Sequence, residues 1–458
     1  MRETSFTLEG TVKVLLEAKK YTSLKDMLLT MNPADIAEVC NTLGKEHLAL
    51  TFRLLSKDLA AETFSNLEPE TQEQLIRSLS DTELKQVVNE LYTDDAVSLV
   101  DDMPANVVKR ILAQADPELR RDINEILRYP ENSAGSVMTT EYVALTPEMT
   151  LEDSITFLRK TGVDKETIYT CYVVEQGKLV GFVTLKDLLM TQRSEATIRD
   201  IMDEHVISCC TGDDREQIAQ MLSKYNFIAL PVVDSDNRLV GIVTFDDAMD
   251  VLEEETTEDI QKMAAILPSE KTYLRSSPLD LFKHRILWLL LLMVSATFTG
   301  MIITDFENAL AAQVALTAFI PMLMDTGGNS GSQASVTVIR ALSLGELDFS
   351  DLPSVIWKEL RTSLLCGGAL GIACFLKIVL IDMLLLGNTS VTLPVTFVVC
   401  LAMVTTVVVA KLIGCMLPML AKKLSFDPAV MASPFITTIV DATSLLFYFG
   451  IARVLLKL

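Results

Sequence analysis

Five long apolar segments in the carboxy-terminal part of the chain limit its fold more than any other feature. They cover residues 286–304, 309–324, 362–386, 391–420 and 432–456. As helices, they can each cross the roughly 30 Å hydrocarbon core of a bilayer, although the second needs its polar extension to do so. The chain is therefore predicted to be multidomain, with a soluble part ahead of an all-α, five-helix transmembrane domain at residues 273–458.

The distribution of charged residues predicts how this domain crosses the membrane. Lys and Arg lie before the first segment, between the second and third, and between the fourth and fifth, at Lys271, Arg275, Lys283, Arg285, Arg340, Lys358, Arg361, Lys422 and Lys423. The opposite connections carry Asp305 and Glu307, or no charge. The positive-inside rule then predicts a multi-pass plasma-membrane protein with a cytoplasmic amino terminus and an extracytoplasmic carboxyl terminus.

The soluble part is strongly acidic. Residues 1–270 carry 26 Lys and Arg against 50 Asp and Glu, whereas residues 271–458 carry 13 against 11. Such a surface attracts cations and repels nucleic acid and anionic lipid, although acidity can also serve only to keep a protein soluble.

The eight cysteines form no CxxC pair, which favours free thiols. No P-loop, GxSxG or HExxH motif occurs, so an enzyme is not expected.

Asp441 lies in the middle of the last apolar segment. A carboxylate at membrane depth costs a few kcal/mol, and such residues usually face a polar pathway. Asp441 is either a cation ligand in a pore or a packing residue that is hydrogen-bonded to another helix. The glycine-rich run 325–333 beside the second segment has two interpretations as well. It could offer backbone and amide oxygens to a hydrated ion, or it could mark a kinked, closely packed helix.

Residues 1–132 show the signals of short helices. Asn32-Pro33 provides a helix cap followed by proline, Ser80 and Glu83 form a capping box, and Thr93 begins another helix. Helix starts near residues 32, 57, 80, 93 and 104 predict an all-α stack of helical hairpins.

Residues 133–250 contain an internal repeat of 60 residues. Gly181 and Gly241 match, as do Thr184 and Thr244, and Asp187 and Asp247. Each copy is predicted to form a β-hairpin followed by a helix that the threonine and aspartate begin.

This repeat resembles a tandem pair of CBS modules with an α/β fold, at residues 133–198 and 199–250. Such pairs often bind adenosine nucleotides, and the resemblance implies that Asp187 and Asp247 contact ribose. It places Lys186 near phosphate and Phe227 against the base, with ATP as a possible cofactor. The alternative is a pair that binds no nucleotide and only relays conformation.

An acidic helix is predicted from residue 246 to about residue 265, and residues 251–272 are assigned as a connecting helix. Asp247, Asp250 and Glu258 share one helix face. If this face meets the acids Asp94 and Asp95, repulsion would separate the domains and divalent cations would draw them together. Hard oxygen ligands without Cys or His favour Mg²⁺ or Ca²⁺. The alternative is a solvated charged surface.

These parts, in this order, resemble the MgtE family of magnesium channels across essentially the whole chain. The motifs are the CBS pair, the acidic helix ending at 257–260, the run 326–333 with Arg340, and Asp427-Pro428-Ala429 followed by Pro434 and Asp441.

The resemblance implies a homodimeric channel in the lipid membrane, with a Mg²⁺ pore at the dimer axis and a connecting helix that closes it when cytosolic Mg²⁺ is high. Asp441 matches the family's pore carboxylate. The matching regulatory positions are Asp94, Asp95, Asp214, Glu216, Asp247, Asp250, Glu255, Glu258, Asp259 and Asp427. The alternatives are a membrane-tethered nucleotide or cation sensor, and a broader transporter of Mn²⁺ or Co²⁺.

Overall fold

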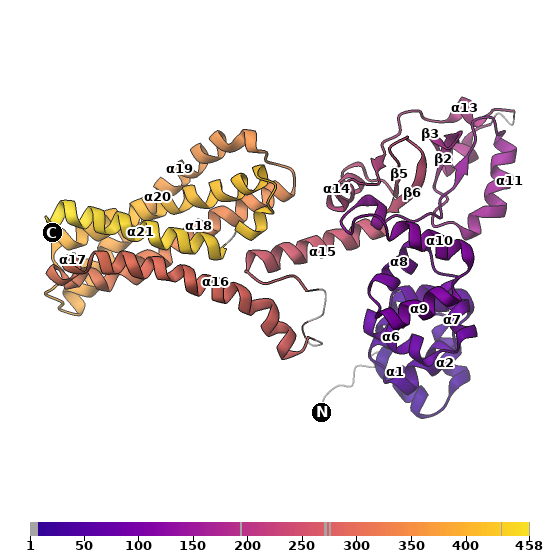
Figure 1. Ribbon diagram of the computed structural model, residues 1–458, viewed down its shortest axis with the longest axis horizontal. Helices are drawn as coiled ribbons and strands as arrows, with labels where there is room; N and C mark the ends of the chain where they lie inside the picture. The colour runs from indigo at the N-terminus through magenta and orange to yellow at the C-terminus, as the bar shows by residue number, and fades with distance from the viewer. Residues whose placement is uncertain (1–7, 193–194, 270–272, 274–275, 432, 458) are drawn as a thin grey trace. The chain divides into compact units, whose positions relative to one another are not determined.

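Figure 1 shows the computed structural model of the chain, which describes residues 8–192, 195–269, 273, 276–431 and 433–457. The chain forms two compact units, Met1–Leu252 and Glu253–Leu458. Each unit has its own core, and each is described by itself below.

The first unit begins with ten short helices. These are α1 (Leu8–Glu17), α2 (Tyr21–Leu28), α3 (Pro33–Asn41), α4 (Lys45–Phe52), α5 (Lys57–Ser65), α6 (Pro69–Ser78), α7 (Asp81–Val88), α8 (Thr93–Asp101), α9 (Ala105–Gln114) and α10 (Pro117–Ile126). Helix α3 packs on α5, α5 on α7 and α7 on α9, so consecutive hairpins stack (Figure 1). The predicted caps are present: Asn32 Oδ1 accepts the Ala34 N–H over 3.0 Å, and Ser80 and Glu83 form a capping box.

The predicted repeat forms two small three-stranded sheets. One contains β1 (Ala144–Leu145), β2 (Thr170–Glu175) and β3 (Lys178–Thr184), and the other contains β4 (Cys209–Cys210), β5 (Ala229–Val233) and β6 (Leu239–Thr244). The helices of the two copies are α11 (Leu151–Thr161), α12 (Leu185–Met190), α13 (Ile198–Ile201) and α14 (Arg215–Tyr225), with the 3₁₀ turns η1 (Ala134–Ser136) and η2 (Gly162–Asp164). Strands β2 and β3 pair antiparallel, and so do β5 and β6, which confirms the predicted hairpins.

Close backbone approach explains the repeated glycines. A Cβ at Gly241 would lie 2.8 Å from the Thr139 carbonyl oxygen, and one at Gly181 would lie 3.0 Å from the Asp203 carbonyl oxygen. A side chain at either position would push a neighbouring chain segment away from the hairpin.

The acidic segment is one continuous helix, α15 (Phe245–Met263). It ends two residues before the predicted end, where Ala265 takes a left-handed conformation with a φ of 54°. The predicted boundary between the connecting helix and the membrane domain, at residue 272, lies outside the described residues.

The second unit is helical. After the end of α15 it contains α16 (Pro278–Asp305), α17 (Glu307–Ala312), η3 (Val314–Phe319), α18 (Ile320–Ser343), η4 (Phe349–Asp351), α19 (Leu352–Lys377), the π-helical η5 (Ile378–Leu385), α20 (Leu393–Lys423), η6 (Pro428–Met431) and α21 (Ser433–Leu456). Within the described residues, four helical segments are long and apolar enough to cross a membrane: Pro278–Asp305, Phe349–Leu385, Leu393–Lys423 and Pro428–Leu456. The chain is therefore a multi-pass membrane protein with four such segments, and the predicted count of five is not confirmed.

The second predicted segment is wrong as a single helix. Residues 309–324 are divided among α17, η3 and the start of α18, which begins at Ile320. The glycine-rich run 325–333 is not an extension of irregular backbone, because it lies inside α18. Its carbonyl groups are therefore used within the helix, and only its side chains remain to meet an ion.

Glycines allow the second unit's helices to pack closely. Helix α18 contacts both α20 and α21. A Cβ at Gly414 of α20 would lie 2.2 Å from the carbonyl oxygen of Gly331 in α18. Gly367 and Gly371 of α19 face Val404 of α20 in the same way, with Cβ distances of 3.3 and 2.9 Å. This supports the interpretation of these glycines as packing residues.

Candidate cation sites

In the first unit, several carboxylates from α8, the start of α15 and the segment after η2 lie close enough for their charges to interact. They are Asp94, Asp95, Glu166, Asp246, Asp247 and Asp250, and we call them the α8–α15 carboxylate group. The Asp95 N–H donates to Asp94 Oδ1 over 2.8 Å, which fixes the first turn of α8. Asp247 caps α15 by accepting a hydrogen bond from the Thr244 hydroxyl. The starts of α8 and α15 and the segment after η2 thus contribute these side chains from three separate parts of the chain.

Burial and mutual repulsion make this group unfavourable in its ionised form. Burial, with repulsion from Asp247 and Asp246, raises the pKa of Asp95 to about 7. Burial also raises the pKa of Asp247 to about 6, against the stabilising hydrogen bond from Thr244. The pKa of Asp94 is raised well above its ordinary value, first by burial and then by Asp247. A bound cation would relieve these costs, as protons do.

Glu166 belongs to this group, although no sequence motif singles it out. Burial, followed by Asp247 and Asp246, raises its pKa to about 8. Its Oε2 atom is buried and has no hydrogen-bond partner among the described residues. Glu166 follows the short turn η2, where no periodic pattern marks a binding residue.

Asp214 and Glu216 have a different environment from Asp94 and Asp95. Asp214 caps α14 by accepting from the N–H groups of Glu216 and Gln217, at 2.9 and 3.4 Å. Glu216 Oε1 accepts from the Gln220 amide over 3.1 Å. No interaction described for either residue joins it to the α8–α15 carboxylate group.

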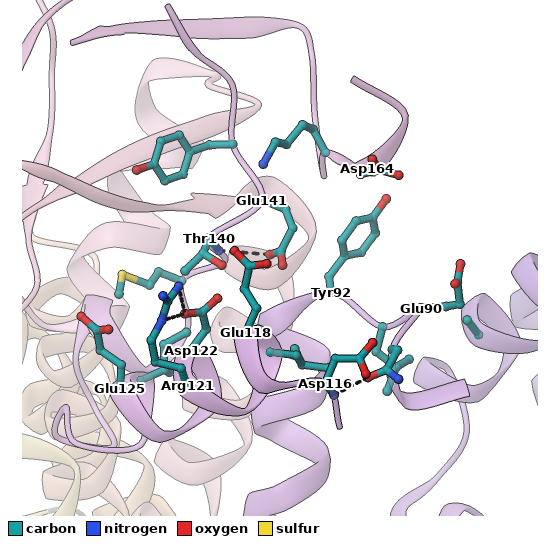
Figure 2. Close-up of a pocket in the computed structure, with 18 of the residues that line it drawn as sticks. Glu90, Tyr92, Asp116, Glu118, Arg121, Asp122, Glu125, Thr140, Glu141 and Asp164 are labelled. Atoms are coloured by element: carbon teal, nitrogen blue, oxygen red, sulfur yellow. Dashed lines mark hydrogen bonds and ion pairs between the residues drawn. The ribbon is translucent and has the colours of Figure 1, made fainter. Parts of the chain in front are cut away.

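A cavity of about 1010 Å³ lies beside this group, between the helical hairpins and the strands of the first unit (Figure 2). Nine of its lining residues are acidic and two, Arg121 and Lys165, are basic. Figure 2 shows Glu141 beside Thr140, whose N–H donates to Glu141 Oε2 over 3.2 Å. Tyr92 lines the cavity, and burial, followed by the charges of Glu166 and other acids, raises its pKa to about 12. The cavity therefore extends the negative potential of the carboxylate group.

The end of α15 belongs to the second unit, where it contacts the helical bundle. Lys262 Nζ lies 2.6 Å from Asp427 Oδ2 and also pairs with Glu258. Asp259 Oδ2 accepts from the Ser343 hydroxyl at the end of α18, over 3.2 Å. Burial and the charge of Asp427 raise the pKa of Asp259.

Further contacts surround the end of α15 and the residue Asp427 that pairs with it. Met263 packs against Ile339 and Ala429. Asp427 Oδ1 accepts from the Ala429 N–H over 2.8 Å, which starts η6. Glu255 is half-buried one turn before Asp259, and its charge acts on Asp259. Lys262 thus joins Glu258 to Asp427, and the charges of Asp427 and Glu255 act on Asp259. Among the described residues, no three acidic, His or Cys side chains form a group that could hold a metal ion as the structure stands.

Asp441 lies on α21, within one of the four apolar segments. Its Oδ1 atom is buried and has no hydrogen-bond partner in the described part of the chain. No described hydrogen bond to this atom supports the packing interpretation, and the role of Asp441 as a cation ligand stays a prediction. Asp325 of α18 lies close enough for its charge to act on Asp441.

Lys186, Asp187 and Phe227 were expected to contact a nucleotide, and each has its own local environment. Asp187 Oδ2 accepts from the Thr184 hydroxyl over 2.5 Å and caps α12, while Lys186 is exposed beside it. Phe227 stacks on Tyr225, with ring centroids 5.4 Å apart. None of these residues lines the cavity of Figure 2.

Comparison with known proteins agrees with this arrangement. Residues 320–451 match the family model described as a divalent cation transporter, residues 31–132 match the MgtE intracellular N domain, and residues 134–193 and 198–254 match CBS domains. The magnesium transporter MgtE of Thermus thermophilus is 38% identical over 364 residues, which is 79% of this chain and 79% of that protein. This chain belongs to the MgtE family.

Other MgtE proteins extend the match to nearly the full length. The magnesium transporter MgtE of Bacillus subtilis is 31% identical over 96% of this chain and 95% of its own. A crystal structure of the cytosolic domain of the Mg²⁺ channel MgtE in complex with ATP matches with a TM-score of 0.51 and 35% identity, over 53% of this chain and all of that one. MgtE relatives are thus named as transport proteins rather than enzymes.

Proposed function

We propose that this protein is a Mg²⁺-selective channel for magnesium uptake, closed by cytosolic Mg²⁺. The observation that carries the proposal is Asp441, a carboxylate inside an apolar helix of an MgtE family member, whose buried Oδ1 atom has no hydrogen-bond partner among the described residues. Such a group is costly at membrane depth unless water or a cation reaches it.

Permeation would use Asp441 from two copies of the chain. A homodimer in the plasma membrane, with a cytoplasmic amino terminus and α18 as a fifth span, would place both carboxylates at a shared axis. Mg²⁺ sheds water reluctantly, so each carboxylate would contact the ion's water shell. The membrane potential would drive entry, contributing about 4.6 kcal/mol for two charges at 100 mV.

Closure would depend on α15. Mg²⁺ would bind the α8–α15 carboxylate group, where Asp94, Asp95, Asp247 and Asp250 supply hard oxygen ligands. At the other end of the helix, Glu255, Glu258, Asp259 and Asp427 would bind Mg²⁺ at the bundle. Each bound ion would neutralise carboxylates that repel one another, and so would hold α15 in place. Asp214 and Glu216 would contribute a separate site at the start of α14.

ATP is proposed as a ligand of the CBS pair. The cytosolic domain of the Mg²⁺ channel MgtE that matches with 35% identity was crystallised with ATP, and residues 134–193 and 198–254 of this chain match CBS domains. Lys186 would meet phosphate, Asp187 the ribose and Phe227 the base.

Flux into liposomes that carry the full chain tests the proposal. Asp441→Asn should reduce Mg²⁺ influx about a hundredfold or more, while Asp305→Asn, an exposed acid at the end of α16, should leave it unchanged. Full influx through Asp441→Asn would refute the pore role.

Replacement of Glu255, Glu258 and Asp259 by their amides should leave influx active at high internal Mg²⁺. If that variant still closes, the sensor role of α15 is wrong.

A broader substrate range is the second candidate. The family model that matches residues 320–451 is described as a divalent cation transporter. Parallel influx measurements with Mn²⁺, Co²⁺ and Ca²⁺ decide between the two, because a Mg²⁺-selective channel should exclude these ions at equal concentration.

A further inference from the structure

Helix α18 carries a polar stripe along its exposed side. Asp325, Asn329, Gln333, Thr337 and Arg340 are all exposed on the single chain. Their spacing of four, four, four and three residues places them on one helix face. The opposite face, with Gly327, Gly331 and Val338, is buried against α20 and α21.

Such a stripe is incompatible with a lipid-facing surface. Ionisable and amide side chains within the membrane face a water-filled path or another protein surface, because hydrocarbon offers them no hydrogen bonds. The stripe therefore faces the ion path or a second copy of the chain.

Packing contacts place Asp325 at the depth of Asp441. A Cβ at Gly327 would lie 3.0 Å from Val440 Cγ1, and one at Gly328 would lie 3.0 Å from Thr437 Cγ2. Asp325 is two residues before Gly327, and Asp441 follows Val440. The charges of the two carboxylates act on each other, which agrees with this register.

Asp325 is held in position by its own helix. The Asn329 amide donates to Asp325 Oδ1 over 3.2 Å, one turn further along α18. No hydrogen bond to its Oδ2 atom is described, and Oδ1 of Asp441 also has no partner among the described residues. Each of the two carboxylates thus has one oxygen for which no donor is found among the described residues.

We infer that Asp325 shares the permeating divalent cation with Asp441 and sets the preference for divalent over monovalent ions. The inference rests on the proposed channel function. Two carboxylates from one subunit carry a charge of −2, which matches one hydrated divalent ion. Two subunits would present four carboxylates. Asn329 acts as a positioning residue that orients Asp325.

Influx of Mg²⁺ and of Rb⁺ into liposomes containing the full chain tests this inference. Asp325→Asn keeps the size of the side chain and removes its charge. We expect the Mg²⁺ concentration for half-maximal influx to rise about tenfold or more, which corresponds to about 1.4 kcal/mol. Rb⁺ influx should increase relative to Mg²⁺ influx. Asp325→Glu, which retains the charge, should retain the divalent preference, and Asp305→Asn serves as the matched control.

The outcomes separate this inference from the channel proposal. If Asp441→Asn abolishes influx and Asp325→Asn behaves like the wild type, the inference is wrong and the channel proposal stands. If neither variant changes influx, both fail. If Asp325→Asn lowers the influx of every cation equally and also lowers the unfolding temperature, Asp325 has a structural role and the inference is overturned.

Discussion

Lys262 and Asp427 form an ion pair that joins the end of α15 to the start of η6, with 2.6 Å between Nζ and Oδ2. Lys262 is the only base between residues 246 and 265, where eight residues are acidic. Its ammonium group pairs with Glu258 and Asp427, two of the carboxylates that a Mg²⁺ ion would neutralise in the proposed closure. The same helix end can therefore be held by a resident positive charge or by a bound ion.

The first prediction concerns this ion pair. In Lys262→Met, Glu258, Asp259 and Asp427 lose their counter-charge, so the last turns of α15 should open more often in the absence of Mg²⁺. Backbone amides of residues 256–263 should exchange roughly two- to fivefold faster, as expected for an ion pair worth about 0.5–1 kcal/mol. Hydrogen-exchange mass spectrometry of the full chain in EDTA measures this rate.

Added Mg²⁺ should restore the protection in Lys262→Met, because the ion replaces the lost charge. Lys160→Met, which removes an exposed positive charge from α11, is the control and should not change exchange in α15. Unaltered exchange in Lys262→Met would show that the ion pair does not hold the helix end.

The second prediction concerns pH. The pKa of Asp95 is about 7 in the folded chain and is ordinarily 3.8, so ionisation destabilises the fold as pH rises from 3.8 through 7. Asp94, Asp247 and Glu166 shift in the same direction, toward higher pKa. In EDTA, the first unit should therefore unfold at a higher temperature at pH 6 than at pH 8.

Mg²⁺ at pH 8 should raise the same unfolding temperature, and Asp95→Asn should reduce both the pH effect and the Mg²⁺ effect. A change of about 1 kcal/mol corresponds to roughly 2–4 °C for a unit of this size. Scanning calorimetry of the full chain provides the measurement. Equal unfolding temperatures at pH 6 and pH 8 would contradict the assigned burial of these carboxyl groups.

The third prediction concerns helix packing. In Gly414→Ala, the new methyl group would lie 2.2 Å from the Gly331 carbonyl oxygen, so α18 and α20 must separate. Overpacking of this kind costs about 1–3 kcal/mol. Gly450→Ala is the matched control, because nothing lies within 4 Å of its Cβ. Thermal unfolding in detergent should show a clear loss for the first variant alone. Equal stability of both variants would refute the close contact.

The fourth prediction concerns nucleotide binding. Lys186 is exposed beside the Asp187 cap, and we expect it to meet the phosphates of ATP. Lys186→Ala should weaken ATP binding about fivefold and leave adenosine binding unchanged, because only ATP carries the charge that Lys186 would attract. Isothermal titration calorimetry of the full chain measures both ligands, with Lys160→Ala as the control. A similar loss for adenosine would show that Lys186 does not act through phosphate.

Local signals in the sequence predicted local structure well. The capping residues Asn32 and Ser80 start helices as expected, and the repeated Thr184 and Thr244 precede helices after their hairpins. These features depend on neighbours within a few residues, which the sequence displays directly. The proximity of Asp94 to Asp247 was expected only conditionally, because it depends on how α8 packs against the start of α15.

Tertiary contacts account for what the sequence did not predict. Glu166 joins the acidic group from the segment after η2, where no sequence pattern marks it. The sequence left two interpretations of the run 325–333 open, exposed backbone oxygens or a closely packed helix, and α18 continues through the run with Gly327 and Gly331 packed against α20 and α21. The helix in turn places Asp325 close enough to Asp441 for its charge to act there, although the two residues are 116 positions apart in the sequence.

The most direct test of the account is the position of a bound divalent ion near Asp441. Structure determination of the full chain in Mg²⁺ and in EDTA, at a resolution that shows the ion's octahedral water shell, locates such an ion. We expect a peak about 4–5 Å from Asp441 carboxylate oxygens, the distance of one intervening water layer, with Asp325 on the same side. A peak confined to the acidic groups of α15, together with a dry Asp441 bonded only to protein, would contradict the account.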